Sequence, residues 1–149
     1  MSNQPVRTAV TVLLLIAASG FPGFGPGTAA AIDLVIIANP GVPETAIDSK
    51  DLQRIYLGKQ TQWQDDTSIV PVMLKSGPLQ EEFIGSFVDR SLQRFVTYWR
   101  QMVFTGKGIP PKSFGEELDL VDFVAGTPGA VGFTSKASDV SRVKILQVD

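Results

Sequence analysis

The sequence predicts an α/β domain with a mixed or parallel sheet flanked by helices. A continuous apolar and β-branched run at 32–38 is typical of a strand that is covered on both faces. A second apolar run, 69–74, leads through a turn directly into a helical pattern, and the pattern over 92–103 is the most regular helical one in the chain. Segments with strand character therefore alternate with segments with helix character, as they do in α/β domains.

The first helix is expected to end at Leu57. Residues 39–47 are rich in turn formers, and either Asp48 or Ser49 can cap the helix start. Gly58 stands where a helix commonly ends in a left-handed residue. Three apolar side chains follow the spacing i, i+3 and i+4 of one helix face: Leu52, Ile55 and Tyr56.

Two more helices are expected in the middle of the chain. Between 59 and 68 lies a polar connection whose Trp63 is interpreted as a packing residue rather than a stacking platform. Ser91 can cap the helix over 92–103, whose apolar stripe we expect to face the core. The helix after the turn carries five apolar residues: Leu79, Phe83, Ile84, Phe87 and Val88. The stripe of the later helix consists of Leu92, Phe95, Val96, Trp99, Met102 and Val103.

The remaining elements are shorter. Residues 106–112 are expected to form a loop, and a short helix over 118–125 closes at Gly126. Strands are expected at 130–134 and at 143–148, after a Thr-Pro-Gly turn.

The N-terminus has the pattern of a secretory signal peptide. Arg7 precedes a short apolar run from Ala9 to Ala18, and a small-residue cluster follows at 28–31. The run is too short for a membrane-spanning helix. The expected division is a signal peptide over 1–31 and one domain over 32–149, located in the periplasm or secreted; the alternative is an uncleaved anchor or a tail.

Composition restricts the chemistry. Without Arg7, 12 Lys and Arg remain against 15 Asp and Glu, a mildly acidic balance that disfavours nucleic-acid binding. The chain has no cysteine and no histidine, which excludes disulfides, Ser-His and Cys-His catalysis and imidazole metal sites. The adjacent acidic pairs at 65–66, 81–82 and 116–117 are interpreted as solvated surface. We therefore expect neither an enzyme nor a cofactor.

The strand-to-helix turn is the best candidate site. Lys75, Ser76 and Gly77 end the apolar run, and Pro78 suits a first helical position. Free amides at a helix start, together with the helix dipole, favour an anion, and Lys75 adds positive charge. The alternative is a plain connection that binds nothing. A weaker candidate is Lys107, which lies between two glycines in the 106–112 loop.

Four stretches of the sequence resemble a known family. They read Asn-Pro-Gly-Val at 39–42, Leu52 to Trp63 with Ile-Tyr-Leu-Gly-Lys at 55–59, Gly-Lys-Gly at 106–108, and Thr-Pro-Gly-Ala-Val-Gly-Phe at 127–133. In this order they are similar to the phosphate-binding proteins of ABC transporters, within the periplasmic-binding-protein-like superfamily, and closest to its short, single-lobe members. The resemblance implies a single lobe of a type II periplasmic-binding-protein-like fold, a small oxyanion such as phosphate as ligand, and an ABC permease or another envelope protein as partner.

The chain also departs from the family. Transporter members are longer and two-lobed, and their corresponding turn resembles an Arg followed by Asp-Gly-Ser-Gly-Thr. Here Met73 and Leu74 replace the polar and Arg positions, and short members often carry Arg where this chain has Gln80. The residues expected to bind the ligand are Lys75, Ser76, Gly77, Gln80 and Lys107.

Two functions follow from this resemblance. The first is an exported solute-binding protein that binds phosphate or a similar oxyanion weakly, since a bidentate Arg is the stronger device for phosphate. The alternative is a degenerate lobe that has lost its ligand and binds another envelope protein.

Overall fold

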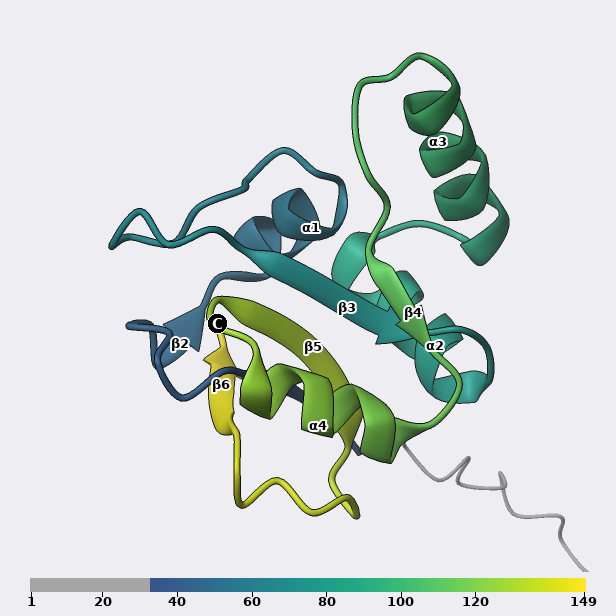
Figure 1. Ribbon diagram of the computed structural model, residues 1–149. Coiled ribbons are helices and arrows are strands. Elements are labelled where there is room, and N and C mark those ends of the chain that lie inside the picture. Colours follow the sequence, from purple (N-terminus) through teal and green to yellow (C-terminus); the bar gives the residue numbers. More distant parts are fainter. Residues whose placement is uncertain (1–32) are drawn as a thin grey trace, which may run out of the picture. The chain divides into compact units, whose positions relative to one another are not determined.

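The computed structural model describes residues 33–149 (Figure 1). The predicted signal peptide over 1–31 lies outside the described residues, so its cleavage and the domain boundary stay predictions. No helix in the described part of the chain combines the length and the apolarity that crossing a bilayer would require.

The strands of the described region form one mixed sheet. Its order is β2–β6–β1–β5–β3–β4. β1 pairs antiparallel with both β5 and β6, and all other neighbours are parallel, which confirms the predicted α/β class with a mixed sheet. The strands are β1 (Leu34–Ala38), β2 (Ala46–Ile47), β3 (Val70–Leu74), β4 (Lys112–Phe114), β5 (Ala130–Ser135) and β6 (Lys144–Val148).

The helices begin where the capping residues predict. The side chain of Asp48 accepts a hydrogen bond from the Lys50 amide at the start of α1, and Ser91 accepts one from the Arg94 amide at the start of α3. Gly58, with φ +70°, follows α1 in the left-handed conformation. The elements are α1 (Ser49–Tyr56), α2 (Pro78–Phe83), the π-helical turn η1 (Ile84–Val88), α3 (Leu92–Phe104) and α4 (Glu117–Gly126).

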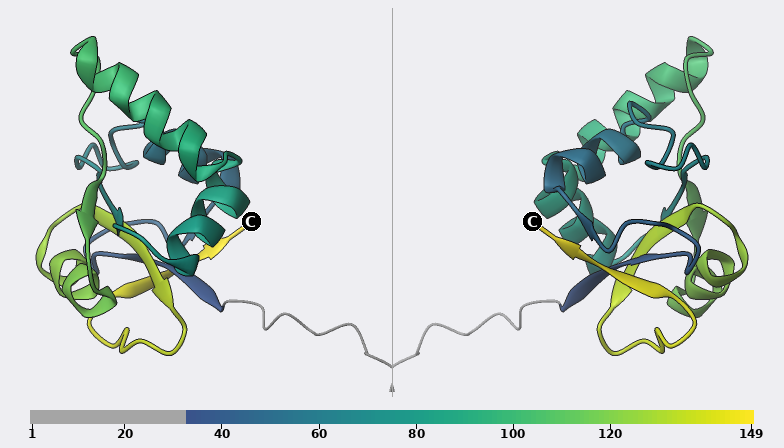
Figure 2. Two further views of the ribbon diagram at one scale, coloured as in Figure 1. Left: turned by 90° about the vertical axis from the view of Figure 1, so that its right-hand side faces the viewer. Right: turned by 90° about the vertical axis from the view of Figure 1, so that its left-hand side faces the viewer.

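The sheet lies between two helical layers. Figures 1 and 2 show α4 on one face of the sheet and α1, α2 and η1 on the other, with α3 extending away from them. Phe83 of α2 stacks on Phe133 of β5 with ring centroids 4.0 Å apart, and the Tyr56 ring meets Phe83 edge-on at 4.6 Å. Three aromatic rings therefore join α1, α2 and the centre of the sheet.

Tyr56 also connects two strands. The β3–β5 ladder pairs Val70 with Ala130 and Pro71 with Val131, and Pro71 has no amide hydrogen to donate. The Tyr56 hydroxyl donates to the Val72 carbonyl at 2.7 Å and lies 3.3 Å from the Val131 carbonyl. It therefore bridges β3 and β5 just beyond the point where their ladder ends.

Trp63 packs in the core, as predicted. Its ring is buried, and its indole Nε1 donates to the Gly129 carbonyl at 3.0 Å. Gly129 has φ +77°, and a Cβ atom there would lie 2.0 Å from the Ser68 carbonyl oxygen. Only glycine fits this turn, because both the backbone angle and the close approach exclude a side chain.

The structure corrects two expectations about the elements. The loop expected over 106–112 gives way at Lys112 to β4, a short edge strand that pairs with β3. The α3 stripe is only partly core, because Val96 is 45% exposed and Val103 is 53% exposed. Periodicity identified the apolar face of α3 but not whether anything covers it.

Candidate functional site

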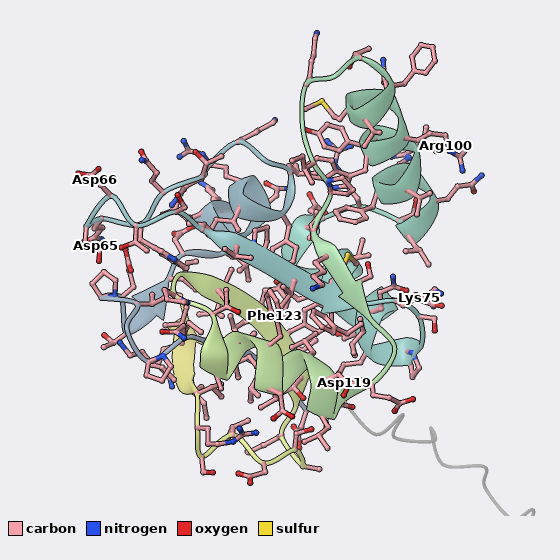
Figure 3. All side chains as sticks on the ribbon, viewed as in Figure 1. Asp65, Asp66, Lys75, Arg100, Asp119 and Phe123 are labelled. Atoms are coloured by element: carbon pink, nitrogen blue, oxygen red, sulfur yellow. The ribbon has the colours of Figure 1, made fainter. Side chains whose placement is uncertain are left out.

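Three parallel strands end at one edge of the sheet. β5, β3 and β4 are neighbours and run in the same direction, so the turns after Ser135, Leu74 and Phe114 lie along a single edge. Figure 3 shows Lys75, after β3, and Asp119, in the first turn of α4, at this end of the molecule. Ligands of open α/β sheets bind at such carboxyl edges, so this is the place to look for a site.

The turn between β3 and α2 presents free amides. The Lys75 amide donates to the Phe114 carbonyl at 2.7 Å, which fixes the turn to β4. Gly77 has φ +101° and no side chain caps the helix that follows it. Within residues 33–149, no backbone or side-chain acceptor receives the amides of Ser76, Gly77, Leu79 or Gln80. Because these residues precede or begin α2, their amides are the unsatisfied donors of a helix start.

Four of the predicted ligand residues belong to this turn, but they do not play equal parts. Lys75, Ser76 and Gly77 are exposed. Gln80 is only 7% exposed, and its Nε2 donates to the Lys75 carbonyl at 3.2 Å. The side-chain amide of Gln80 therefore stabilises the turn from its buried side. Lys75 and Gln80 line a pocket of ≈ 270 Å³, together with Ser113 and apolar residues from α3.

The structure does not bring Lys107 to this turn. Lys107 lies in the connection that enters β4 at its amino end, whereas Lys75 follows the carboxyl end of the adjacent parallel strand β3. Figure 1 shows the connection from α3 to β4 at the top, away from the β3–α2 turn. Lys107 instead lines a separate, mostly apolar pocket of ≈ 500 Å³ with Trp99, Met102 and Ile109.

A second polar cluster at the same edge was missed. One carboxylate oxygen of Glu117, at the start of α4, accepts hydrogen bonds from four donors. They are the hydroxyls of Thr134 at 2.6 Å, Ser135 at 2.7 Å and Ser138 at 2.6 Å, and the Ser135 amide at 2.9 Å. The donors converge as they would on a bound anion, but the protein's own carboxylate fills the position.

The environment of Glu117 holds it ionised. Partial burial by itself raises the pKa of this carboxyl, but the hydrogen bonds from Ser138, Thr134 and Ser135 outweigh burial and lower the pKa of Glu117 from 4.5 to about 2. The interpretation of the 116–117 pair as solvated surface is therefore wrong for Glu117. The hydroxyl-rich segment 134–138, which begins at the end of β5, was the signal in the sequence.

The comparisons with known proteins bear on the fold. Neither a protein-family model nor a curated protein matches the sequence. Among solved structures, an ABC-type phosphate transport receptor from Vibrio cholerae matches with a TM-score of 0.54 and 20% identity, over 78% of this chain and 46% of the receptor. A putative phosphate ABC transporter substrate-binding protein with bound phosphate from Clostridium perfringens matches with a TM-score of 0.61 and 19% identity, over 78% and 45%.

A third structure agrees with these two. PstS from Borrelia burgdorferi matches with a TM-score of 0.62 and 16% identity, over 78% of this chain and 47% of PstS. The fold is that of the phosphate ABC transporter substrate-binding proteins. The fold predicted from the family resemblance is thereby confirmed, and this chain spans less than half the length of each of these three proteins.

Proposed function

We propose that this protein is an exported solute-binding protein of the phosphate type, which binds a small oxyanion weakly at the β3–α2 turn. The observation that supports it is the set of free amides at Ser76, Gly77, Leu79 and Gln80, at the carboxyl edge of a sheet with the phosphate-binding-protein fold. Backbone N–H groups at a helix start hydrogen-bond anions without any further ligand.

The side chains of the turn have distinct parts in this proposal. The Lys75 ammonium supplies the positive charge, the Ser76 hydroxyl donates to the anion, and Gln80 keeps the turn in shape through its bond to the Lys75 carbonyl. Lys107 has no contact with this anion, since it lies in another connection.

Weak binding follows from the surroundings of the turn. Among the described residues, no Arg lines the pocket that contains Lys75 and Gln80, so no guanidinium there can form a bidentate pair with the anion, and Asp119 contributes negative charge at the same edge. An anion on exposed amides also keeps much of its water. We expect a dissociation constant near the millimolar range, which corresponds to about 4 kcal/mol of binding free energy.

The remaining parts of the proposal concern the protein's setting. Export is supported by the signal-peptide pattern of the N-terminus. A transport role requires a partner, either an ABC permease or another envelope protein. The absence of histidine and cysteine from the sequence supports a binding rather than a catalytic function.

Calorimetry and thermal unfolding with phosphate and sulfate test the proposal. At a ligand concentration ten times the dissociation constant, binding stabilises the folded state by about 1.4 kcal/mol, which is measurable as a rise in Tm. Lys75→Ala should weaken binding, and Lys107→Ala is the matched control that should leave it unchanged. Gly77→Ala should also weaken binding, because its φ of +101° is strained for alanine.

Two results would contradict the proposal. Absence of both heat and a Tm shift at tens of millimolar phosphate and sulfate would leave the alternative function, a lobe that binds another envelope protein. Loss of binding in Lys107→Ala but not in Lys75→Ala would move the site away from the turn.

A further inference from the structure

We call the segment from Arg90 to Gly115 the α3 arm. It comprises α3 and the connection that follows, which project from the domain (Figure 2), and β4, by which the segment rejoins the sheet beside β3. The arm is anchored by its inner face: Trp99 is buried and its Nε1 donates to the Tyr56 carbonyl at 3.1 Å, and the Tyr98 hydroxyl donates to the Leu57 carbonyl at 2.6 Å. α3 is therefore held firmly at α1 while its outer end stays uncovered.

The outer end of the arm exposes large apolar side chains. Phe104, the last residue of α3, is 91% exposed, and Ile109 in the following connection is 88% exposed. Val96 and Val103, also exposed, line a hollow with Phe104 along α3. In the described region the other exposed large apolar side chains are Leu118, 63% exposed, and Ile145, 41% exposed, on other elements. Clustering of exposed apolar side chains on one element marks an interaction surface.

The arm is also strongly basic. It contains five of the chain's 13 Lys and Arg and none of its 15 Asp and Glu. The ion pairs within residues 33–149 are Arg54–Asp51 and Arg142–Asp122, so the cations of the arm have no carboxylate partner there. Arg100 lines a shallow apolar hollow with Val103 and Phe104. The basic residues are Arg90, Arg94, Arg100, Lys107 and Lys112.

Charge decides between occupants of this surface. Two copies that pack arm against arm would bring unpaired cations together, which is unfavourable. Phe104 could instead insert into the apolar pocket beside Trp99 of a second copy, but Lys107 and Lys112 line that pocket. The cations near Phe104 would then meet these two lysines, which is equally unfavourable. An anionic bilayer instead matches both properties, because apolar tips insert among the head groups while neighbouring cations contact lipid phosphates.

We propose that the outer end of the α3 arm binds an anionic lipid surface. Phe104 and Ile109 insert at the level of the head groups, and Arg100 and Lys107 contact the phosphates around them. This places the anchored domain against a membrane, with the carboxyl edge of the sheet still open. The inference does not depend on phosphate binding at the β3–α2 turn.

The experiment needs a local readout, because the apolar N-terminal stretch of the full chain can bind lipid by itself. The chain has no cysteine, so Thr105→Cys creates a unique position beside Phe104 for an environment-sensitive fluorophore. Ala137→Cys, in the exposed β5–β6 connection, carries the same fluorophore as a control. With vesicles of phosphatidylglycerol and phosphatidylcholine, the label at residue 105 should shift to the blue and the label at residue 137 should not. Pure phosphatidylcholine vesicles should produce a much smaller shift.

Variants separate the two contributions. Neutralising Arg100 and Lys107 to Gln should weaken the vesicle affinity reported at residue 105 by about 30-fold. Neutralising Lys50 and Lys136 to Gln, with the same change of net charge, is the control and should have little effect. Phe104→Ser should weaken the vesicle affinity by about tenfold. Leu118→Ser, which also removes an exposed apolar side chain, should leave that affinity unchanged.

Three results would overturn the proposal. The first is an unshifted label at residue 105 when the protein sediments with anionic vesicles. The second is equal affinity for the arm variants and their controls. The third is a shift with polyglutamate but not with vesicles, which would replace the lipid surface by an acidic protein partner.

Discussion

Replacing Glu117 with glutamine should destabilise the protein and remove part of its pH dependence. Glu117 accepts four hydrogen bonds on one oxygen, at 2.6–2.9 Å. Glutamine keeps an acceptor oxygen of similar shape but loses the negative charge, and hydrogen bonds to a charged acceptor are roughly twice as strong as neutral ones. The substitution therefore tests the charge and not the packing.

The pKa gives the size of the effect. A lowering from 4.5 to about 2 corresponds to about 3 kcal/mol without solvent screening. Because the carboxylate is only part-buried, we expect screening to reduce this to about 1–2 kcal/mol. The folded state holds the lower pKa, so this contribution is complete above about pH 5 and is lost as the pH falls towards 2.

Urea unfolding at several pH values between 2 and 6 measures this contribution. The wild-type protein should be more stable than Glu117→Gln by about 1–2 kcal/mol at pH 6, and the difference should shrink towards zero near pH 2. The other carboxyl groups are present in both proteins, so their contributions to the pH dependence of stability cancel in the difference. Glu116→Gln is the matched control, since Glu116 is exposed and caps α4 with no side-chain hydrogen bond. A constant difference from pH 6 to pH 2 would refute the reasoning.

Two other substitutions test the packing of the domain. Gly129→Ala should cost at least about 2 kcal/mol of unfolding free energy, because the added Cβ meets the Ser68 carbonyl at 2.0 Å and φ is +77°. Gly126→Ala, with open space around it, is the control and should be neutral or slightly stabilising. Equal losses of stability for the two variants in chemical denaturation would contradict the steric argument. Trp99→Ala should lower the unfolding free energy by about 3–5 kcal/mol, because it leaves a cavity and removes the hydrogen bond from the indole to the Tyr56 carbonyl. Tyr98→Phe removes only the hydroxyl bond to the Leu57 carbonyl and should lower it by about 1 kcal/mol. A Trp99→Ala protein of near wild-type stability would show that the arm is not anchored as described.

Most of the fold was predictable because its signals are local. The caps at Asp48 and Ser91 and the left-handed Gly58 marked the limits of α1 and the start of α3 in the sequence alone. Two short strands were not predictable in this way. β2 has two residues and β4 has three, and such segments become strands only through pairing with β6 and β3.

The candidate site was predictable in part, for the same reason. The Ser-Gly-Pro sequence at 76–78 indicated the exposed turn, and the structure shows that its amides lack protein acceptors. The inward direction of the Gln80 side chain and the separation of Lys107 from the β3–α2 turn depend on how β4 and α3 pack, which no local pattern encodes. Glu117 was missed because its partners lie 17 to 21 residues away in sequence.

The bridge that Tyr56 makes between β3 and β5 has a consequence for spectroscopy. Burial raises the pKa of this phenol well above its usual range, so the group stays protonated as long as the domain is folded. The chain has only two tyrosines. In alkaline solution, tyrosinate absorbance from Tyr56 will therefore develop only as the core unfolds. The rise in ultraviolet absorbance from this residue thus reports unfolding at the centre of the sheet without an attached dye.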